Sequence, residues 1–366
     1  MRTHSVAYLP GDGIGPEVCD VARRCVDTSG AAFGFDVSWN EQSVGGAAID
    51  AIGQALPPVT LEACRSSDAI LLGAVGGPRW DDPSATARPE DALLALRSEL
   101  ELFANLRPVT AHAALAAASP LRPEVRKGAD ILILRELTGG LYFGRPQGRE
   151  EHDGVESVVD TLRYTRAEIE RIVDLAFELA EGRRGHLTSV DKANVLASSR
   201  LWREVVNEIA TQHPTVTVEH ALVDSTAYLI LTQPTHYDVI VTENLFGDIL
   251  SDEAAAIAGS LGLMASASLG TRTTAEGRFG MYEPVHGSAP GIAGQGVANP
   301  LATVASAAMM LRLSLGEADA ADDLETAVTA AIEDGPRTGD LGGSDGTEAI
   351  ASFLLTRIGA GVEVTA

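Results

Sequence analysis

The chain has few basic side chains and few cysteines for its 366 residues. Lysine and arginine together number 27, against 51 aspartates and glutamates, which leaves a formal net charge of −24. A surface this acidic repels nucleic acid and anionic lipid headgroups, so we expect neither as a partner. Cys19, Cys25 and Cys64 show neither zinc-ligand nor redox-pair spacing, which is typical of a reducing compartment.

Long apolar runs are also lacking. The first residues, MRTHSVAYLPGDG, contain no apolar core of the kind that a signal peptide has. No stretch offers the roughly 18 uninterrupted apolar residues that a membrane span needs. We therefore expect a cytoplasmic protein that does not enter a membrane.

Short apolar runs alternate with longer segments of helical period. The runs are VAYL, AILLGAV, DILILREL, HLTSVD, VTVEHALVD and DVIVTENLF. This alternation predicts an α/β fold, and the chain length favours two domains. The clearest helix begins at Pro16 and Glu17 and keeps its apolar spacing until Gly30. The nearly uncharged stretch 254–269 is expected to be a helix buried in the core or against another subunit.

A glycine-rich turn follows the first predicted strand, in the segment GDGIGPE. Gly11, Gly13 and Gly15 allow the backbone to approach a ligand closely, and Asp12 adds a polar group beside the helix start. Taken alone, such a segment is more often only a tight turn. It also lacks the GxGxxG spacing of a Rossmann nucleotide site, so we predict no Rossmann fold.

An anionic substrate would need local arginines to reach a site on so acidic a protein. If Pro89 opens a helix, then Glu90, Leu93, Leu94 and Arg97 share one face of it. That face places an apolar patch between an acid and an arginine, as a substrate site would require. The alternative is an ordinary amphipathic helix with both leucines in the core and Glu90 paired with Arg97.

Further polar side chains follow the expected strands and helices. Arg107 lies at an Arg-Pro step, where the Pro89 helix must already have ended. Arg135 and Tyr142 follow one apolar run and Lys192 follows another, at strand ends that face ligand crevices in α/β proteins. A buried tyrosine and a solvated lysine are the ordinary alternatives. A lysine whose pKa is lowered by desolvation or by a nearby cation could instead act as a general base.

Three aspartates predict a site for a divalent cation. Asp248 and Asp252 are four residues apart, so on a helix their carboxylates point the same way and repel each other unless something neutralises them. Asp224, at the end of another expected strand, could supply a third oxygen and leave positions open for water and substrate, as Mg²⁺ or Mn²⁺ prefers. The alternative is a solvated acidic helix face. The segment EPVHGSAP, which contains His286, is expected to be a structured loop or an ordinary turn.

Nine segments, taken in order, resemble the 3-isopropylmalate dehydrogenases of the isocitrate/isopropylmalate dehydrogenase family. They are GDGIGPE, LLGAVGGPRW, LLALR, FANLRP, RELTGGLYFG, SVDKANV, VTENLFGDILSD, EPVHGSAP and LGGSDGTEA, and they span almost the whole chain. The resemblance implies a first, cofactor-binding domain from residues 1–102 and 259–366. It implies a second domain from residues 103–258 that carries substrate, metal and the dimer interface.

The resemblance also implies a reaction and the residues that perform it. We expect oxidation and decarboxylation of (2R,3S)-3-isopropylmalate to 4-methyl-2-oxopentanoate and CO2, with NAD reduced, as a step of leucine biosynthesis. The protein would be a homodimer whose partner subunit supplies Lys192 and Asp224 to a shared active site. Tyr142 and Lys192 would move protons.

The remaining residues carried over by the resemblance fall into groups. The implied ligands of Mg²⁺ or Mn²⁺ are Asp224, Asp248 and Asp252. The residues implied for the substrate are the carboxylate-binding Arg97, Arg107 and Arg135, together with Asp224, and an apolar pocket of Leu93, Leu94 and Val195. The residues implied for NAD, along GGPRWDDPSATARP and GSAPGIAGQGVAN, are Ile14, Gly76, Gly77, Glu90, Glu283, His286, Gly287, Ser288, Ala289, Pro290, Gly291, Ile292 and Asn299.

Two features depart from the family pattern. At Gly291, NAD-using members typically carry an aspartate that binds the adenosine ribose and repels a 2′-phosphate, so discrimination against NADP is expected to be weaker here. The segment 271–281 is longer than the pattern. A D-malate or tartrate dehydrogenase and a catalytically silent regulatory relative remain alternatives, although a silent relative would typically lack some of the acid, lysine and tyrosine residues present here.

Overall fold

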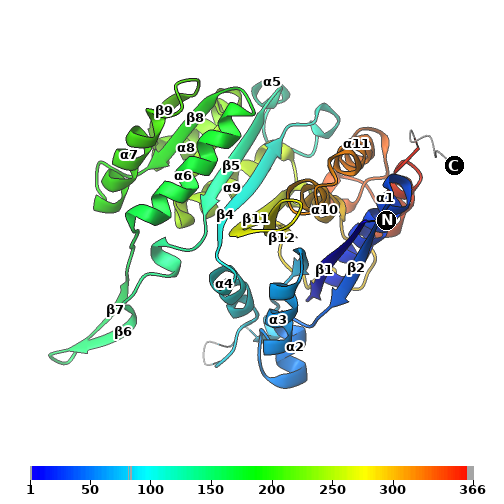
Figure 1. The fold of residues 1–366 in the computed structure, drawn as a ribbon, viewed down its shortest axis with the longest axis horizontal. Coiled ribbons are helices and arrows are strands. Elements are labelled where there is room, and N and C mark those ends of the chain that lie inside the picture. The colour runs from blue at the N-terminus through cyan, green and yellow to red at the C-terminus, as the bar shows by residue number, and fades with distance from the viewer. Residues whose placement is uncertain (1, 81, 83–84, 361–366) are drawn as a thin grey trace. The chain divides into compact units, whose positions relative to one another are not determined.

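The computed structural model describes residues 2–80, 82 and 85–360, and its chain forms two compact units. Unit 1 combines both chain ends, Met1–Leu102 and Ala258–Ala366, with the short segment His112–Pro120. Unit 2 consists of Phe103–Ala111 and Leu121–Ile257. Residues His112–Pro120 therefore belong to unit 1, although they lie within the stretch 103–258 expected for the second domain. Strands alternate with helices in both units (Figure 1), which confirms the predicted α/β class.

Unit 1 has a mixed sheet in the order β2-β1-β3-β12-β11. The first four of these strands run parallel and β11 pairs antiparallel with β12. The strands are β1 (Arg2–Gly11), β2 (Phe35–Glu41), β3 (Ala69–Ala74), β11 (Ala265–Thr273) and β12 (Arg278–Pro284). The segment 271–281 thus comprises the end of β11, the turn of the hairpin and the first residues of β12.

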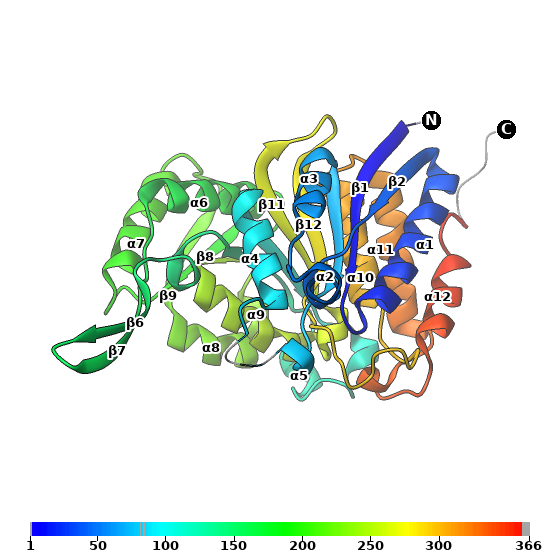
Figure 2. The same ribbon diagram turned by 90° about the horizontal axis from the view of Figure 1, so that it is seen from below.

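Helices cover both faces of the unit 1 strands (Figure 2). They are α1 (Gly15–Phe33), α2 (Gly45–Ile52), α3 (Pro58–Ser66), α4 (Pro89–Glu99), α10 (Leu301–Leu313), α11 (Ala318–Asp334) and α12 (Thr347–Leu355), with short 3-10 turns η1 (Pro78–Trp80), η2 (Ala113–Leu115), η5 (Leu261–Leu263) and η6 (Gly339–Leu341). The helix predicted to open at Pro89 is confirmed. Its Leu96 is fully buried with Leu9 and Ile70 of the strands, so this side of α4 faces the core of unit 1.

Unit 2 has strands in the order β4-β5-β10-β8-β9. β4 pairs antiparallel with β5, and the other pairs are parallel. The strands are β4 (Leu102–Thr110), β5 (Asp130–Glu136), β8 (His186–Asp191), β9 (Thr217–Leu222) and β10 (Val239–Thr242), with a separate hairpin of β6 (Gln147–His152) and β7 (Val155–Asp160). This hairpin projects from the rest of its unit (Figure 1).

The helices of unit 2 lie on both sides of β8 and β9, with α6 and α7 on one side and α8 and α9 on the other (Figure 2). They are α5 (Pro123–Arg126), α6 (Arg166–Glu181), α7 (Ala197–Ala210), α8 (Val223–Thr232) and α9 (Asn244–Ala258), with 3-10 turns η3 (Gly140–Tyr142) and η4 (Pro234–His236). The carboxyl ends of the parallel strands β5, β8 and β10 meet at one edge, where the predicted catalytic segments follow them.

The predicted first helix is confirmed, and one other local prediction was wrong. α1 continues past Gly30 to Phe33, and Gly34 ends it in the left-handed conformation with φ 80°. Gly30 lies inside the helix. An added Cβ there would lie 2.7 Å from the carbonyl oxygen of Phe35, which accounts for glycine at this position. The uncharged stretch 254–269 is not one helix, since it contains the end of α9, the turn η5 and the first half of β11. Its apolar character reflects burial of successive elements rather than one helical face.

Within residues 2–80, 82 and 85–360, no helix combines the length and the apolar character needed to cross a bilayer.

The three cysteines should be chemically silent in the folded protein. All are free and buried, and burial raises the thiol pKa of Cys25 and of Cys64 to about 12, and that of Cys19 well above its usual range. At pH 8 the reactive thiolate is therefore scarce. We expect no rapid reaction of native protein with Ellman's reagent and release of three equivalents of chromophore per chain in guanidinium chloride. Rapid labelling of even one native thiol would contradict this burial.

Candidate active site

A cluster of arginines and aspartates lies at the carboxyl edge of unit 2. Arg135, the penultimate residue of strand β5, is 1% exposed, and its Nη1 contacts a carboxylate oxygen of Asp248 on α9. Its Nε and Nη2 donate to the Asn244 side-chain oxygen at 3.0 and 2.8 Å. The parallel pairing of Arg135 with Thr242 explains this contact, because α9 begins two residues after Thr242.

Arg107 approaches the same helix from β4. It is buried, and its Nη1 donates to Ser251 Oγ at 2.6 Å and to Asp252 Oδ1 at 3.1 Å. Its Nε donates to Asn105 Oδ1 at 2.7 Å, which orients the guanidinium group. The structure thus brings together Arg107, Arg135, Asp248 and Asp252, and the helical i, i+4 spacing of the two aspartates is confirmed.

Tyr142 joins this cluster from η3. Its hydroxyl donates to Asp248 Oδ2 at 2.7 Å, and Arg135 lies over its ring at 5.7 Å from the ring centre. Burial and the Asp248 carboxylate raise the pKa of Tyr142 to about 12, so the phenol keeps its proton near neutral pH. Burial also raises the pKa of Asp252, and the neighbouring Asp248 charge adds to this effect while Arg107 opposes it.

Lys192 and Asp224 form a second, separate pair in unit 2. Lys192 directly follows β8, Asp224 lies in the first turn of α8, and their side chains are joined by an ion pair of 2.5 Å. This contact lowers the pKa of Asp224. Among the described residues, Asp224 does not join Asp248 and Asp252 in one group of convergent ligands within the single chain.

The donor set of this region suits a hard divalent cation. Asp248 and Asp252 offer carboxylate oxygens, which Mg²⁺ and Mn²⁺ prefer, from successive turns of one helix. The side chains of Asp248 and Asp252 are 35% and 59% exposed, so both oxygens can be reached by an ion. Arg107 and Arg135 lie beside these aspartates and oppose their mutual repulsion.

In unit 1 the predicted cofactor residues surround the glycine-rich turn after β1. Gly13 has a φ of 60°, and an added Cβ would lie 2.0 Å from the carbonyl oxygen of Ser288, so only glycine fits. The Ile14 backbone NH donates to the same Ser288 oxygen at 2.9 Å. An added Cβ at Gly76 would lie 2.9 Å from the Glu90 carboxylate. Ile14, Gly76, Glu90 and Ser288 are therefore neighbours.

Asp12 organises this turn, a role that sequence reasoning did not assign to it. Its side chain is buried and accepts hydrogen bonds from the backbone NH groups of Gly46, Ala47 and Gly76, at 2.7, 2.8 and 2.9 Å. One carboxylate thus ties together the segment after β1, the start of α2 and the segment after β3. The only available sequence signal was the GDG motif itself.

The other predicted residues of unit 1 lie near the end of β12 and on α4. Arg97 pairs with Glu283 at 3.3 Å, rather than with Glu90 as the alternative of an ordinary amphipathic helix predicted. His286 Nδ1 contacts the Gly287 carbonyl at 2.9 Å, while its buried Nε2 has no hydrogen-bond partner among the described residues. Such an orphaned nitrogen beside Ser288 fits a site that a polar cofactor would complete.

Other predicted residues are exposed or rest on neighbours within their own unit. Asn299 donates to Asp340 at 3.0 Å, Gly77 lies against the Trp80 ring, and Ala289 has a φ of 39°. Gly287, Pro290, Gly291 and Ile292 are exposed in the loop that follows β12. Within the segment GGPRWDDPSATARP, residues 81, 83 and 84 lie outside the described residues.

The three residues expected to form an apolar pocket occupy both units. Leu93 packs against the core of unit 1, Leu94 is half-buried on α4, and Val195 of unit 2 is 63% exposed. The pocket therefore stays a prediction. Sequence reasoning missed Asn105, Asn244 and Ser251, which orient the arginines. Their positions in the sequence could have indicated them, because each lies within two residues of Arg107, of Asp252 or of the last residue of β10.

A family model described as isocitrate/isopropylmalate dehydrogenase matches residues 5–354. The chain belongs to this family. Among its relatives, the 3-isopropylmalate dehydrogenase of Heyndrickxia coagulans is 58% identical over 351 residues, covering 96% of this chain and 94% of that protein. That of Anaeromyxobacter dehalogenans is 53% identical over 353 residues, covering 96% and 99%. A solved isocitrate dehydrogenase of Methylococcus capsulatus superimposes with a TM-score of 0.85 at 35% identity, covering 97% and 99%.

Membership of the isocitrate/isopropylmalate dehydrogenase family confirms the resemblance found in the sequence and the predicted fold. The match spans both units and includes every segment on which the resemblance was based. The matched residues include the arginines and acids of unit 2. They also include the glycine-rich turn of unit 1.

The buried contacts of Asp12 generate a prediction for this site. Asp12→Asn replaces one acceptor oxygen by an amide NH2, which must face at least one backbone NH. We expect a loss of about 2–3 kcal/mol in the free energy of unfolding and weaker binding of nicotinamide cofactor. Chemical unfolding and cofactor titration would measure both effects. The matched control is Asp27→Asn, because Asp27 accepts a single exposed hydrogen bond from Trp39 in the same unit. Equal stability of the two variants would contradict the organising role of Asp12.

Proposed function

We propose that this chain oxidises and decarboxylates (2R,3S)-3-isopropylmalate to 4-methyl-2-oxopentanoate and CO2 while reducing NAD, as in leucine biosynthesis. The observation that carries the proposal is the likeness, over almost the whole chain, to relatives named 3-isopropylmalate dehydrogenase. The cluster of Arg107, Arg135, Asp248 and Tyr142 supports an active enzyme rather than a silent regulatory relative. A cytoplasmic location remains part of the proposal.

Arginine and aspartate would divide the work of binding. Arg107 and Arg135, with Arg97, would hold the two carboxylates of the substrate through charge-assisted hydrogen bonds. Asp248 and Asp252, with Asp224 from a partner subunit, would hold Mg²⁺ or Mn²⁺. When bound, the cation supplies a Lewis acid that lowers the pKa of the substrate hydroxyl, and the nicotinamide supplies a hydride acceptor.

Lys192 and Tyr142 would move the protons. Lys192 is the general base in this proposal and, as a neutral amine, would take the hydroxyl proton directly or through water. Tyr142 keeps its proton at neutral pH, and its hydroxyl is oriented by Asp248, so it can donate or relay a proton to C3 after CO2 leaves. Leu93, Leu94 and Val195 would receive the isopropyl group and exclude water from it.

A homodimer would complete this site. The Lys192–Asp224 pair and the Asp248–Asp252 pair belong to one unit but form separate groups in one chain. Tyr228, one turn after Asp224, and Ile249, next to Asp248, are 69% and 55% exposed. Large exposed apolar side chains beside polar functional groups are typical of a subunit contact. In the dimer, each chain would give Lys192 and Asp224 to its partner.

NAD is the proposed cofactor, along the glycine turn and the loop after β12. Gly291 is exposed in this loop and has open space around it. An aspartate at this position would repel a 2′-phosphate, so its replacement by glycine supports measurable use of NADP.

The proton-transfer roles predict a loss of turnover without a loss of cofactor binding. Lys192→Met and Tyr142→Phe should each lower kcat by a factor on the order of 10² to 10⁴, measured as absorbance at 340 nm. Lys127→Met is the matched control, because exposed Lys127 is the only other lysine of the chain. Near-normal kcat in either variant would remove that residue from the mechanism.

Substrate preference is the direct test of the proposed function. With NAD and Mg²⁺, kcat/KM should be highest for 3-isopropylmalate, and D-malate and tartrate should follow by about 10- to 200-fold, because contact with the isopropyl group is worth only about 1–3 kcal/mol. Chelation by EDTA should abolish activity, and added Mg²⁺ or Mn²⁺ should restore it. A preference for isocitrate would overturn the assignment, and parallel assays with NADP would test the effect of Gly291.

A further inference from the structure

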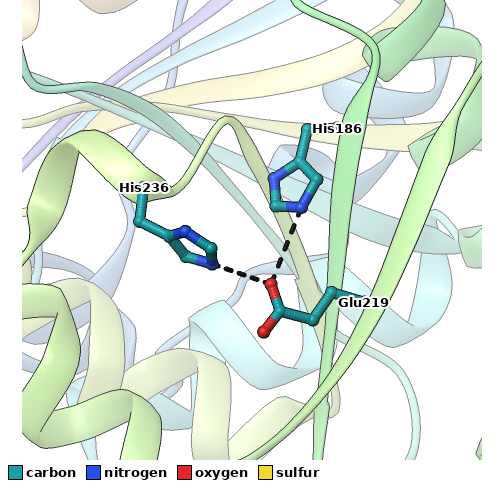
Figure 3. A group of neighbouring side chains, drawn as sticks. All are labelled: His186, Glu219 and His236. Carbon is teal, nitrogen blue, oxygen red and sulfur yellow. Dashed lines mark hydrogen bonds and ion pairs between the residues drawn. The ribbon is translucent and has the colours of Figure 1, made fainter.

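Two histidines and a glutamate converge at the amino edge of the unit 2 strands. His236 Nε2 lies 2.7 Å from Glu219 Oε2, and His186 Nε2 lies 3.6 Å from the same oxygen. One donor atom from each residue lies within 4.8 Å of the others, and this is the one group of its kind among the described residues. Both rings are directed at the carboxylate from different elements (Figure 3).

The sheet itself brings these residues together. His186 is the first residue of β8, and Glu219 on β9 pairs with Thr188, two residues further along β8, so His186 and Glu219 share one face. His236 ends η4, the turn that leads into β10 on the other side of β8. Three neighbouring chain segments thus each contribute one ligand.

The backbone and rings of the cluster are held in place. The His186 backbone NH donates to Asp238 at 3.3 Å, and the His236 backbone NH donates to the Gln233 carbonyl at 3.1 Å. The two rings pack edge to face at 5.4 Å, and Tyr237 packs against His236 at 5.1 Å. These contacts orient both rings toward the Glu219 carboxylate.

We propose that His186, Glu219 and His236 bind one Zn²⁺ ion per chain. Two imidazoles and one carboxylate are a recurrent zinc ligand set, and the fourth position is then left to water. Ligands about 2.0–2.2 Å from a tetrahedral ion lie roughly 3.3 Å apart, between the two separations seen here. His186 is half-buried and the other two ligands are exposed, so the ion has access from solvent.

This site is distinct from the aspartate site at the other edge of the sheet. His186 begins β8 and Lys192 directly follows its last residue, so the two lie about 20 Å apart along a strand that rises roughly 3.3 Å per residue. The ligand chemistry also differs, since imidazole favours zinc and an all-oxygen site favours Mg²⁺ or Mn²⁺. The bound ion would fasten η4 to β8 and β9.

Calorimetric titration of the untagged full-length protein with ZnCl2, in excess Mg²⁺ to occupy the aspartate site, tests the proposal. We expect one tight Zn²⁺ per chain and a rise in Tm on binding. His236→Gln and Glu219→Gln should each weaken Zn²⁺ binding at least about tenfold while leaving dehydrogenase activity unchanged. Co²⁺ as a spectroscopic probe should give visible bands of tetrahedral intensity that His186→Gln abolishes.

Two control variants separate this site from other zinc ligands. His213→Gln removes a histidine that pairs with Glu181 at 2.9 Å in the same unit but lacks a second histidine, and it should bind Zn²⁺ like the wild type. Asp252→Asn should also retain tight Zn²⁺ binding. The proposal is overturned if wild type and His236→Gln bind Zn²⁺ equally, or if Asp252→Asn is the variant that loses it. Because His236 and Glu219 are exposed, their variants keep the test decisive even if His186→Gln fails to fold.

Discussion

The pairing of two buried arginines with two aspartates on α9 is the constraint on which the unit 2 site depends. Removing a guanidinium group from water costs several kcal/mol unless carboxylates and hydrogen-bond acceptors compensate it. Arg135 is 1% exposed, and Asp248 and Asn244 at the start of α9 supply that compensation. The helix must therefore begin directly over the end of β5, which also fixes the positions of Asp252 and the Tyr142 contact.

The same network gathers two arginines at one place in a chain of charge −24, as binding of the proposed dianionic substrate would require. Local charge outweighs net charge, because screening by salt limits the distant acids to a range of about 8–10 Å. The aspartates compensate the charge of the arginines, and the arginines oppose the repulsion between Asp248 and Asp252. In the proposed function, substrate and cation would replace these mutual contacts with their own.

Local patterns in the sequence predicted the local features of this structure. Pro89 and the spacing of Leu93 and Arg97 predicted α4, and apolar runs predicted the strands whose ends carry Arg135 and Lys192. The stretch 254–269 was misjudged, since a buried helix and a buried strand have the same apolar composition. The contacts of Asp12 and Asn244 could not be read, because they join residues 34 to 109 positions apart and depend on the tertiary fold.

The basic side chains of this chain are nearly all arginines. Of the 27 basic residues only Lys127 and Lys192 are lysines, so 27 − 2 = 25 are arginines. Arginine keeps its charge at any physiological pH and binds carboxylates in a fixed planar geometry, whereas lysine can release its proton when its surroundings lower its pKa. Lys127 is exposed at the end of α5, in a region with no proposed role. Lys192, the second lysine, directly follows β8, where we propose the general base, and the groups proposed to bind the substrate carboxylates are arginines.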